Sequence, residues 1–278
     1  MKIAGSVALV TGSNRGIGRA YVKALLAMGA KKVYAAAREI KGVEDLVRAS
    51  PGKVEAVQLD VTQETQVKAA AAKCKDVSLL INNAGANGVS AALGAPTLDA
   101  AFREMNVNYF GVLLVTRAFA PVLKANGGGA LVNVLSVVAR ENMPIIGTYS
   151  ASKAAAWSLT QATRSELAGQ GTLVVGVFPG AVDTDMAKGF DMAKIAPAEV
   201  ADVSLKAVES GTEDIDVGAT ASNSMFADPV ELEKEFITFL QRFRNRYADT
   251  GEVPTSLTGD LGRLETEFTA YIKRIRNR

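Results

Sequence analysis

The sequence predicts a doubly wound α/β domain, in which helices cover both faces of a parallel sheet, with an added helical C-terminal tail. Short apolar runs alternate with helix-periodic stretches over the first 220 residues or so. The apolar runs are of strand length and lack polar alternation, which indicates strands buried on both faces. Repeated strand-helix units favour parallel strands joined by helical crossovers.

The strands are expected where the apolar runs occur. In chain order they are SVALVT (6–11), KVYAAA (32–37), VEAVQL (54–59), VSLLIN (77–82), ALVNVLS (130–136), TLVVGVF (172–178) and a weaker last strand near DIDVGA (214–219). Helices fit between them, for example over 18–28, over the long stretch 98–124 and over 198–210. These elements predict a first domain spanning 1–221.

The remaining residues, 222–278, are expected to form a charged helical hairpin. They hold nine acidic and nine basic residues, and Asp228, Pro229 and Glu231 resemble a helix start. Two apolar stripes at helical spacing flank the breaker DTGEVPT: Leu232, Phe236, Phe239, Phe243 and Tyr247, then Leu257, Leu261, Leu264, Phe268, Tyr271 and Ile275. We expect the stripes to be buried in a homo-oligomer, a dimer or tetramer, with packing on the same chain as the alternative.

Composition narrows the classes of protein. With 278 residues, 48% hydrophobic, and a net charge of +2, the chain fits one soluble domain and gives no reason to expect nucleic acid as a partner. No apolar run approaches the roughly 20 residues that span a bilayer, so no membrane role is expected. The start MKIAGSVALV imitates a signal peptide but leads directly into a glycine motif, which favours a buried first strand. The single Cys74 fits a reducing cytoplasm.

The chain contains no histidine. A Ser-His-Asp or Cys-His catalytic device is therefore excluded, and so is a zinc site built on imidazole or several thiolates. We expect no metal. An acid/base enzyme of this composition must carry its proton on a carboxylate, a lysine or a tyrosine.

A glycine-rich turn directly after the first strand predicts a dinucleotide site. Glycines 12, 16 and 18 in TGSNRGIGRA have no side chain to block the backbone. A pyrophosphate could therefore approach the amides of a helix N-terminus at this turn. The second strand ends with Ala37 where an NAD site commonly has an acid, and Arg38 follows. Together with Arg15 in the glycine loop, this favours NADP(H), unless both arginines are merely solvated.

Several motifs together resemble the short-chain dehydrogenase/reductase family in its single-domain subgroup. The glycine loop is similar to TGxxxGxG, NNAG ends at Gly85, Tyr149 and Lys153 form YxxxK, and Ser136 stands thirteen residues before Tyr149. The segment 179–184 resembles PGxVxT and VNYFG supplies Asn108. The resemblance covers about residues 3 to 220 and implies a Rossmann-type fold. Where the family often has a first serine, this chain has Leu135.

The resemblance implies a site made of a catalytic set and a cofactor set. The catalytic residues are expected to be Asn108, Ser136, Tyr149 and Lys153, with Asn106 as the competitor of Asn108. The residues expected to bind the cofactor are Gly12, Ser13, Asn14, Arg15, Gly16, Ile17, Gly18, Arg38, Asp60, Val61, Asn83, Ala84, Gly85, Tyr149, Lys153, Pro179, Gly180, Val182 and Thr184.

The spacing of Tyr149 and Lys153 places both on one helix face, where they suggest a proton carrier. A phenol with the ordinary pKa of about 10 is a reluctant acid/base at neutral pH. A nearby ammonium and an oxidised nicotinamide are expected to lower that pKa. Ser136 would donate a hydrogen bond to the substrate oxygen. The resemblance further implies that Asn108 holds a water that relays protons to Lys153, and that Lys153 binds the nicotinamide ribose.

The expected reaction is hydride transfer between NADP(H) and a small to medium apolar ketone, aldehyde or secondary alcohol, with reduction favoured. Apolar residues suggest this substrate class, although they could equally pack the core or a lid: Val137, Val138, Ala139, Met143, Pro144, Ile145, Met186, Phe190 and Met192. One alternative is an isomerase or dehydratase, whose usual spacing TGxxGxxG is absent. Another is an NADP-binding sensor or assembly protein that acts through its tail.

Overall fold

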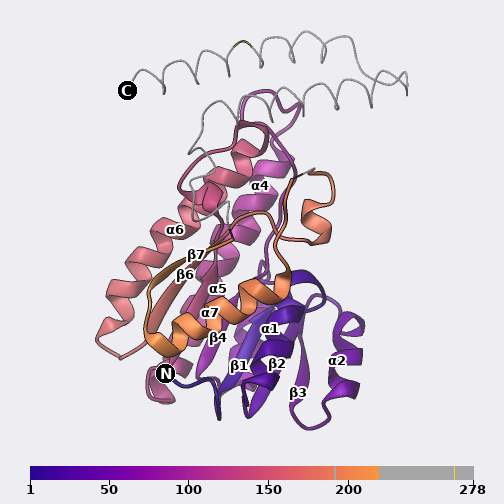
Figure 1. Ribbon diagram of the computed structural model, residues 1–278. Helices are drawn as coiled ribbons and strands as arrows, with labels where there is room; N and C mark the ends of the chain where they lie inside the picture. Colours follow the sequence, from indigo (N-terminus) through magenta and orange to yellow (C-terminus); the bar gives the residue numbers. More distant parts are fainter. Residues whose placement is uncertain (191, 219–265, 267–278) are drawn as a thin grey trace. The chain divides into compact units, whose positions relative to one another are not determined.

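Seven parallel strands form one sheet in the order β3-β2-β1-β4-β5-β6-β7 (Figure 1). The computed structural model describes residues 1–190, 192–218 and 266. The strands are β1 (Val7–Thr11), β2 (Lys32–Ala37), β3 (Val54–Gln58), β4 (Leu79–Asn82), β5 (Ala130–Val134), β6 (Leu173–Pro179) and β7 (Asp214–Val217). Each of the seven strands expected from the sequence is confirmed, and so is the doubly wound α/β fold.

The helices between the strands are α1 (Gly16–Ala27), α2 (Glu44–Ala49), α3 (Glu64–Lys73), α4 (Asp99–Met105), α5 (Val112–Ala125), α6 (Gly147–Ala168) and α7 (Pro197–Ser210). A π-helical segment, Asn106–Gly111, joins α4 to α5. Short helical turns stand at Ile40–Val43, Val137–Ala139, Pro144–Ile146 and Asp185–Ala187.

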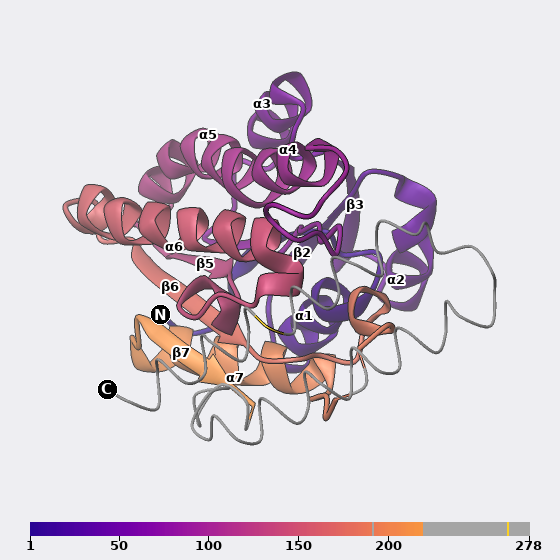
Figure 2. The same cartoon turned by 90° about the horizontal axis from the view of Figure 1, so that it is seen from above.

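The two faces of the sheet carry separate apolar cores. Successive residues of a strand point to opposite faces, so in β1 Ala8 and Val10 face one core while Val7 and Leu9 face the other. The first core packs against α1, α2 and α7, and the second against α3, α5 and α6. Figure 2 shows α3, α5 and α6 on one side of the sheet, and α1 and α7 on the other. Burial on both sides explains why the central strands β1, β4 and β5 lack polar alternation.

The strand order reverses between β1 and β4. The chain runs outward from β1 through β2 to β3, then returns to place β4 on the other side of β1. At such a switch point the loops after the two central strands diverge to opposite faces and leave a crevice at the carboxyl ends. The glycine loop after β1 and the NNAG loop after β4 therefore flank the crevice where a dinucleotide would bind.

The continuous helical stretch Asp99–Ala125 is long and apolar enough to cross a membrane by length and composition alone. A core helix of a soluble protein passes the same test, and this stretch packs Val115, Phe119 and Leu123 into the second core. Two of its charged side chains, Arg103 and Arg117, are exposed. We therefore interpret it as a core helix of the sheet domain.

Residues Met1–Gly218 form one unit. The helical hairpin expected over 222–278 lies outside the described residues apart from Thr266. The hairpin and the expected boundary at residue 221 therefore stay predictions.

Candidate active site

The turn between β1 and α1 favours glycine at three positions, two because of backbone conformation and one for lack of space. Gly12 has φ of +69° and Gly16 has φ of +52°, a region that L side chains rarely adopt. A Cβ on Gly18 would overlap the Gly12 carbonyl oxygen and lie 2.5 Å from the Asn83 Nδ2. The three glycines therefore allow a close approach of backbone to backbone at the start of α1, as the sequence predicts for a pyrophosphate site.

Thr11 and Asn83 tie the glycine loop to the NNAG loop. The Thr11 hydroxyl accepts hydrogen bonds from the backbone amides of Asn83 and Ala84 at 2.9 and 3.0 Å. The Asn83 side chain donates back to the Thr11 carbonyl at 2.9 Å. Gly16 lies against Thr184, since a Cβ there would be 3.0 Å from the Thr184 methyl group. Thus motifs from three strand ends meet.

The remaining predicted cofactor residues lie around the same edge of the sheet. Ser13 is buried and donates to the Val10 carbonyl at 2.6 Å, which fixes the loop. One Asp60 oxygen accepts from the Thr62 amide and hydroxyl at 2.9 and 2.8 Å. Around them lie Asn14 and Ile17 in the glycine loop, Val61 after Asp60, and Pro179, Gly180 and Val182 from the end of β6 onward.

The two predicted cations differ in their surroundings. Arg15 is 66% exposed at its side chain and forms an ion pair with Asp185 at 3.2 Å. Arg38 is exposed directly after β2, where Ala37 leaves no acid. Exposed ion pairs contribute little, about 0–1 kcal/mol, so Arg15 can exchange Asp185 for a ligand phosphate at small cost. Both arginines are therefore available to a 2′-phosphate.

Tyr149 and Lys153 stand one turn apart near the start of α6, and both are buried. The Lys153 Nζ lies 5.8 Å from the centre of the Tyr149 ring. It donates a hydrogen bond to the Val134 carbonyl oxygen at 2.8 Å, at the end of β5. This bond holds the ammonium at the carboxyl edge of the sheet, next to the cofactor loops.

Burial sets the protonation of this pair. It raises the pKa of Tyr149 to about 12, against the opposing effect of a hydrogen bond with Ser136 and with a further upward contribution from the charge of Glu104. It also lowers the pKa of Lys153 to about 8. Without cofactor the net shift of the Tyr149 pKa is therefore upward, because desolvation disfavours the phenolate. The lowering expected from the ammonium and an oxidised nicotinamide together stays a prediction.

Ser136 lies just beyond β5, at the start of the turn Val137–Ala139. Its hydroxyl accepts from the Val138 amide at 3.4 Å, and its side chain lies close enough to Tyr149 to lower the pKa of the phenol against the effect of burial. The predicted fifth strand was two residues too long, since β5 ends at Val134. That ending frees Ser136 from the strand ladder and places it beside the phenol. Leu135, at the place of the family's other serine, is buried in a small apolar cluster.

Asn108 lies in the π-helical segment, and its side-chain amide forms hydrogen bonds with the loop after β4. Its Oδ1 accepts from the Ala86 amide, and its Nδ2 donates to the Ala86 carbonyl and to the Ser152 hydroxyl, all at 2.8 Å. A Cβ on Gly85 would lie 3.4 Å from Asn108 Oδ1 and 3.8 Å from Lys153 Nζ, so both groups converge on Gly85. Asn106, the competitor, is exposed.

The amide hydrogens of Asn108 are thus fully used by protein partners. The water that the resemblance assigns to Asn108 stays a prediction, and it cannot depend on those hydrogens. Single-turn π-helical segments recur at functional sites because they rotate a side chain out of the α-helical register. Here the segment turns Asn108 toward Ala86 while leaving Asn106 in solvent.

Part of the predicted substrate wall surrounds the phenol. Val138, Ile146 and Tyr149 form a buried cluster, against which Val137, Met143, Ile145 and Phe190 pack. Ala139 instead belongs to the neighbouring core cluster of Leu135, Ala156 and Phe178. Pro144 and Met186 are exposed, and Met192 is half-buried. The predicted substrate wall is therefore apolar where it packs against Tyr149.

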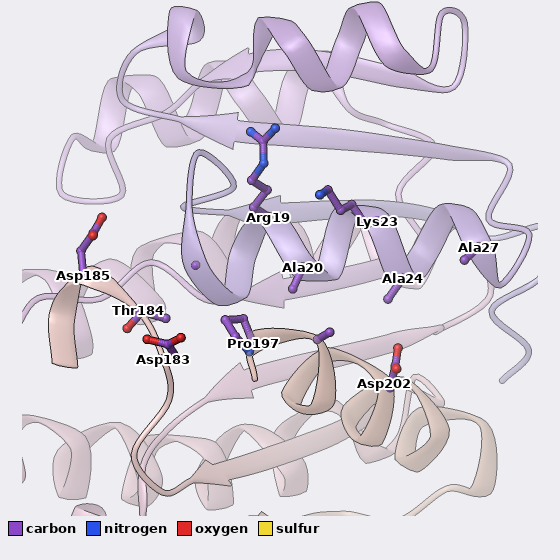
Figure 3. A pocket seen from close by; sticks show the side chains of 12 residues that line it. Arg19, Ala20, Lys23, Ala24, Ala27, Asp183, Thr184, Asp185, Pro197 and Asp202 are labelled. Atoms are coloured by element: carbon purple, nitrogen blue, oxygen red, sulfur yellow. The ribbon is translucent and has the colours of Figure 1, made fainter. Parts of the chain in front are cut away.

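A groove of about 590 Å³ runs between α1 and the start of α7 (Figure 3). Figure 3 shows Ala20 and Ala24 on its α1 side, with Pro197 opposite. Of the predicted site residues it includes only Gly16 and Thr184. The groove therefore adjoins the phosphate end of the site, outside the catalytic centre.

Two residues of the site were missed by sequence reasoning. Ser152 accepts from Asn108 and donates to the Tyr149 carbonyl at 2.7 Å, joining two predicted catalytic residues. Its position in the sequence between Tyr149 and Lys153 could have indicated that Ser152 belongs to the site. Glu104 is a fully buried acid, and its spacing of four from Asn108 was the only signal.

This chain is similar to known proteins over most of its length. The family model described as short chain dehydrogenase matches residues 6–194. An uncharacterized oxidoreductase of Methylorubrum extorquens is 37% identical over 206 residues, covering 72% of this chain and 81% of the relative. A sorbitol dehydrogenase of Cereibacter sphaeroides is 33% identical, covering 72% and 78%.

A solved structure of a short chain dehydrogenase from Burkholderia cenocepacia in complex with NADP is also similar. It is 41% identical, with a TM-score of 0.76, and the match covers 91% of this chain and 100% of that chain. A fold, a glycine loop and a Ser-Tyr-Lys centre of this kind define a nucleotide-dependent oxidoreductase. The chain belongs to the short-chain dehydrogenase/reductase family.

Proposed function

We propose that this protein is an NADP(H)-dependent carbonyl reductase that acts on small to medium apolar ketones or aldehydes. The observation that carries the proposal is the position of Tyr149, Lys153 and Ser136 at the carboxyl edge of the sheet, where Lys153 lies against Gly85 of the loop that Asn83 ties to the glycine loop. The reverse reaction, oxidation of a secondary alcohol, uses the same groups. The reducing direction is favoured because cells generally keep NADP in its reduced form.

The residues present fit NADP(H). A Cβ at Gly18 would collide with the Gly12 carbonyl, and Gly12 and Gly16 have positive φ, so the loop presents bare backbone, which suits a ligand that lies against the chain. Arg15 and Arg38 supply positive charge for a 2′-phosphate, and no acid replaces Ala37 at the end of β2. The Burkholderia relative, solved with NADP, supports the same assignment.

The catalytic residues handle the proton of the reaction. When bound, NADPH supplies the hydride that is added to the carbonyl carbon. As the C=O π bond opens, the Tyr149 hydroxyl gives its proton to the carbonyl oxygen, and Ser136 donates a hydrogen bond to the same oxygen. The Lys153 ammonium then stabilises the Tyr149 phenolate that remains.

The raised pKa of Tyr149 agrees with the reducing direction. An alkoxide is a much stronger base than a phenolate, so a phenol with a pKa of about 12 still gives its proton to a developing alkoxide. Alcohol oxidation needs the phenolate instead. Lowering the pKa from about 12 to neutrality requires about 7 kcal/mol of added stabilisation, which the chain alone does not supply.

The substrate class is argued from the apolar wall beside the phenol. Val138 and Ile146 are buried against Tyr149, with Met143 and Phe190 packed on them. Such a lining favours alkyl or aryl groups over charged ones.

A cofactor-dependent carbonyl screen tests the proposal directly. NADPH and NADH absorbance would be followed in parallel over aliphatic, aromatic and cyclic ketones and aldehydes. We expect turnover of apolar carbonyls with NADPH and much weaker turnover with NADH. Tight NADPH binding without turnover, and without any effect of Tyr149→Phe, would favour the sensor or assembly protein instead.

We also propose that the protein is a homo-oligomer. Phe102 is 64% exposed and Phe110 is 48% exposed on the α4 side of the long helical stretch, and large exposed apolar groups mark association surfaces. The apolar stripes in 222–278 support the same proposal. Light scattering of the full chain and of a chain lacking 226–278 tests whether the tail takes part in assembly. An unchanged number of subunits would reject that role of the tail.

A further inference from the structure

An exposed ion pair joins two of the loops that surround the cofactor site. Arg15 in the glycine loop pairs at 3.2 Å with Asp185, the first residue of the short helical turn after segment 179–184. The same two loops also approach each other at Gly16, because a Cβ there would lie 3.0 Å from the Thr184 methyl group. Figure 3 shows Thr184 and Asp185 beside the first turn of α1. The Arg15 guanidinium is therefore turned toward the segment after β6.

The other side of the glycine loop borders the place where a 2′-phosphate is expected. A Cβ on Gly42, in the turn that follows β2, would lie 2.9 Å from the Cβ of Asn14. Dinucleotide sites recognise the 2′ position of the adenosine ribose at the end of this strand, and Arg38 is exposed there. Arg15 follows Asn14 directly. Its long side chain thus has two alternative anionic partners, Asp185 and the 2′-phosphate.

Asp185 has a second cationic partner. Its carboxylate also pairs with Lys188 at 2.8 Å. Lys188 first, and Arg15 to a smaller extent, hold the pKa of Asp185 below its usual range, so the carboxylate is charged at neutral pH. When Arg15 turns to a phosphate, Asp185 keeps Lys188. The exchange therefore leaves neither charge without a partner and costs no more than one exposed ion pair.

This competition involves one of the two arginines. Over the described parts of the chain, Arg38 forms no ion pair within 4 Å, whereas Arg15 is held by Asp185. Asp183 is exposed two residues before Asp185 and forms no such pair either. Arg38 can therefore receive a phosphate directly, while Arg15 must first leave an acid.

We propose that Asp185 is a specificity-determining residue for the cofactor, which holds Arg15 until the 2′-phosphate of NADP(H) displaces it and so lowers the affinity for NADP(H) relative to NAD(H). The inference rests on the proposed function, to which it adds an acid that opposes the cofactor preference. NAD(H) has no 2′-phosphate and binds with the ion pair intact. Asp185 acts through Arg15 and takes no part in hydride or proton transfer.

Equilibrium binding of the two reduced cofactors tests this role. Dissociation constants of NADPH and NADH would be measured by cofactor fluorescence at one low ionic strength, because salt screens exposed charges. Asp185→Asn keeps the size of the side chain and removes its charge. We expect the Kd of NADPH to fall about two- to fivefold, the size of an exposed ion pair, while the Kd of NADH stays unchanged. In an Arg15→Ala background, Asp185→Asn should change neither constant, because the guanidinium that Asp185 holds is gone.

Asp183→Asn is the matched control, since it removes an exposed acid from the same segment, and it should leave both constants unchanged. An unchanged Kd of NADPH in Asp185→Asn overturns the proposal. A gain that persists in Arg15→Ala, or that Asp183→Asn equals, also overturns it, because the acid would then simply repel the phosphate. Binding needs no carbonyl substrate, so these outcomes are separate from those of the carbonyl screen. A wild-type protein that binds neither cofactor would overturn the proposed function as well.

Discussion

The Lys153 ammonium donates a 2.8 Å hydrogen bond to the Val134 carbonyl and lies 5.8 Å from the centre of the Tyr149 ring. The end of β5 thus holds the Lys153 ammonium near Tyr149. The bond to Val134 does not depend on the ionisation of Tyr149. This arrangement is stable because the carbonyl satisfies one ammonium hydrogen in a buried place. It also carries a cost, because burial disfavours the charged lysine.

Replacing Lys153 by methionine should stabilise the protein against urea at neutral pH. The folded-state pKa is lowered to about 8 from 10.5, so between these values the unfolded chain binds the proton that the folded chain has lost. Wild-type stability from this group therefore rises with pH over that window. The gain of Lys153→Met is at most about 3 kcal/mol below pH 8, less the lost bond to Val134.

Unfolding curves at pH 7 and pH 9.5 check this prediction. The difference between variant and wild type should shrink by about 2 kcal/mol between the two pH values. Lys23→Met, made on the exposed face of α1, is the matched control and should show a difference that does not vary with pH. A constant difference for Lys153→Met would contradict the buried, charged lysine.

Removing Arg38 should weaken the preference for NADPH. Arg38 follows β2 and is exposed, whereas Arg15 is engaged by Asp185, so we expect Arg38 to contribute more to selection. The ratio of kcat/KM for NADPH over NADH should fall roughly ten- to hundredfold in Arg38→Asp, since an ionic contact with phosphate is lost and repulsion is added. Arg48→Asp, on α2, is the control. An unchanged ratio in Arg38→Asp would refute this view of cofactor choice.

Replacing Asn108 by alanine should destabilise the protein and lower kcat together. Three hydrogen bonds of 2.8 Å are lost, and the Ala86 amide and carbonyl lose their partner. We expect about 2–4 kcal/mol, from about 1 kcal/mol per bond plus the cost of unsatisfied groups. Asn106→Ala, two residues away and exposed, should change stability by less than about 0.5 kcal/mol. Equal losses at both positions would show that the π-helical segment does not distinguish them.

An alanine at Gly18 should abolish NADPH binding or folding. Its methyl group would overlap the Gly12 carbonyl and lie 2.5 Å from Asn83 Nδ2, and neither backbone nor a bonded amide moves cheaply. Gly169→Ala, where a Cβ meets nothing within 4 Å, is the control and should leave binding intact. Binding would be measured by the fluorescence of NADPH. Wild-type affinity in Gly18→Ala would contradict a backbone-lined phosphate loop.

Much of the fold could be predicted because its signals are local. The strand β2 was predicted at Lys32–Ala37 because six successive residues suit a strand buried on both faces. The glycine loop and the YxxxK pair were readable because their spacing reflects one turn or one helix face. The end of β5 was not readable, since nothing in ALVNVLS marks where the ladder stops.

The parts that escaped prediction depend on packing in three dimensions. The direction of the pKa shift of Tyr149 follows from how completely α6 and its neighbours exclude water, which a sequence does not state. The pair of Arg15 and Asp185 joins residues 170 positions apart. Glu104 reads as one more charged residue of a helix, and only the packing of α4 on α6 shows that it is buried.

The central claim is that the Tyr149 hydroxyl supplies the proton of carbonyl reduction. Single-turnover reduction of an apolar carbonyl by the NADPH complex of Tyr149→Phe tests it most directly. We predict that NADPH affinity stays within about twofold while the rate falls on the order of 10²- to 10⁴-fold, the contribution of a positioned general acid. A variant that binds NADPH and keeps more than about a tenth of the wild-type rate would contradict the claim.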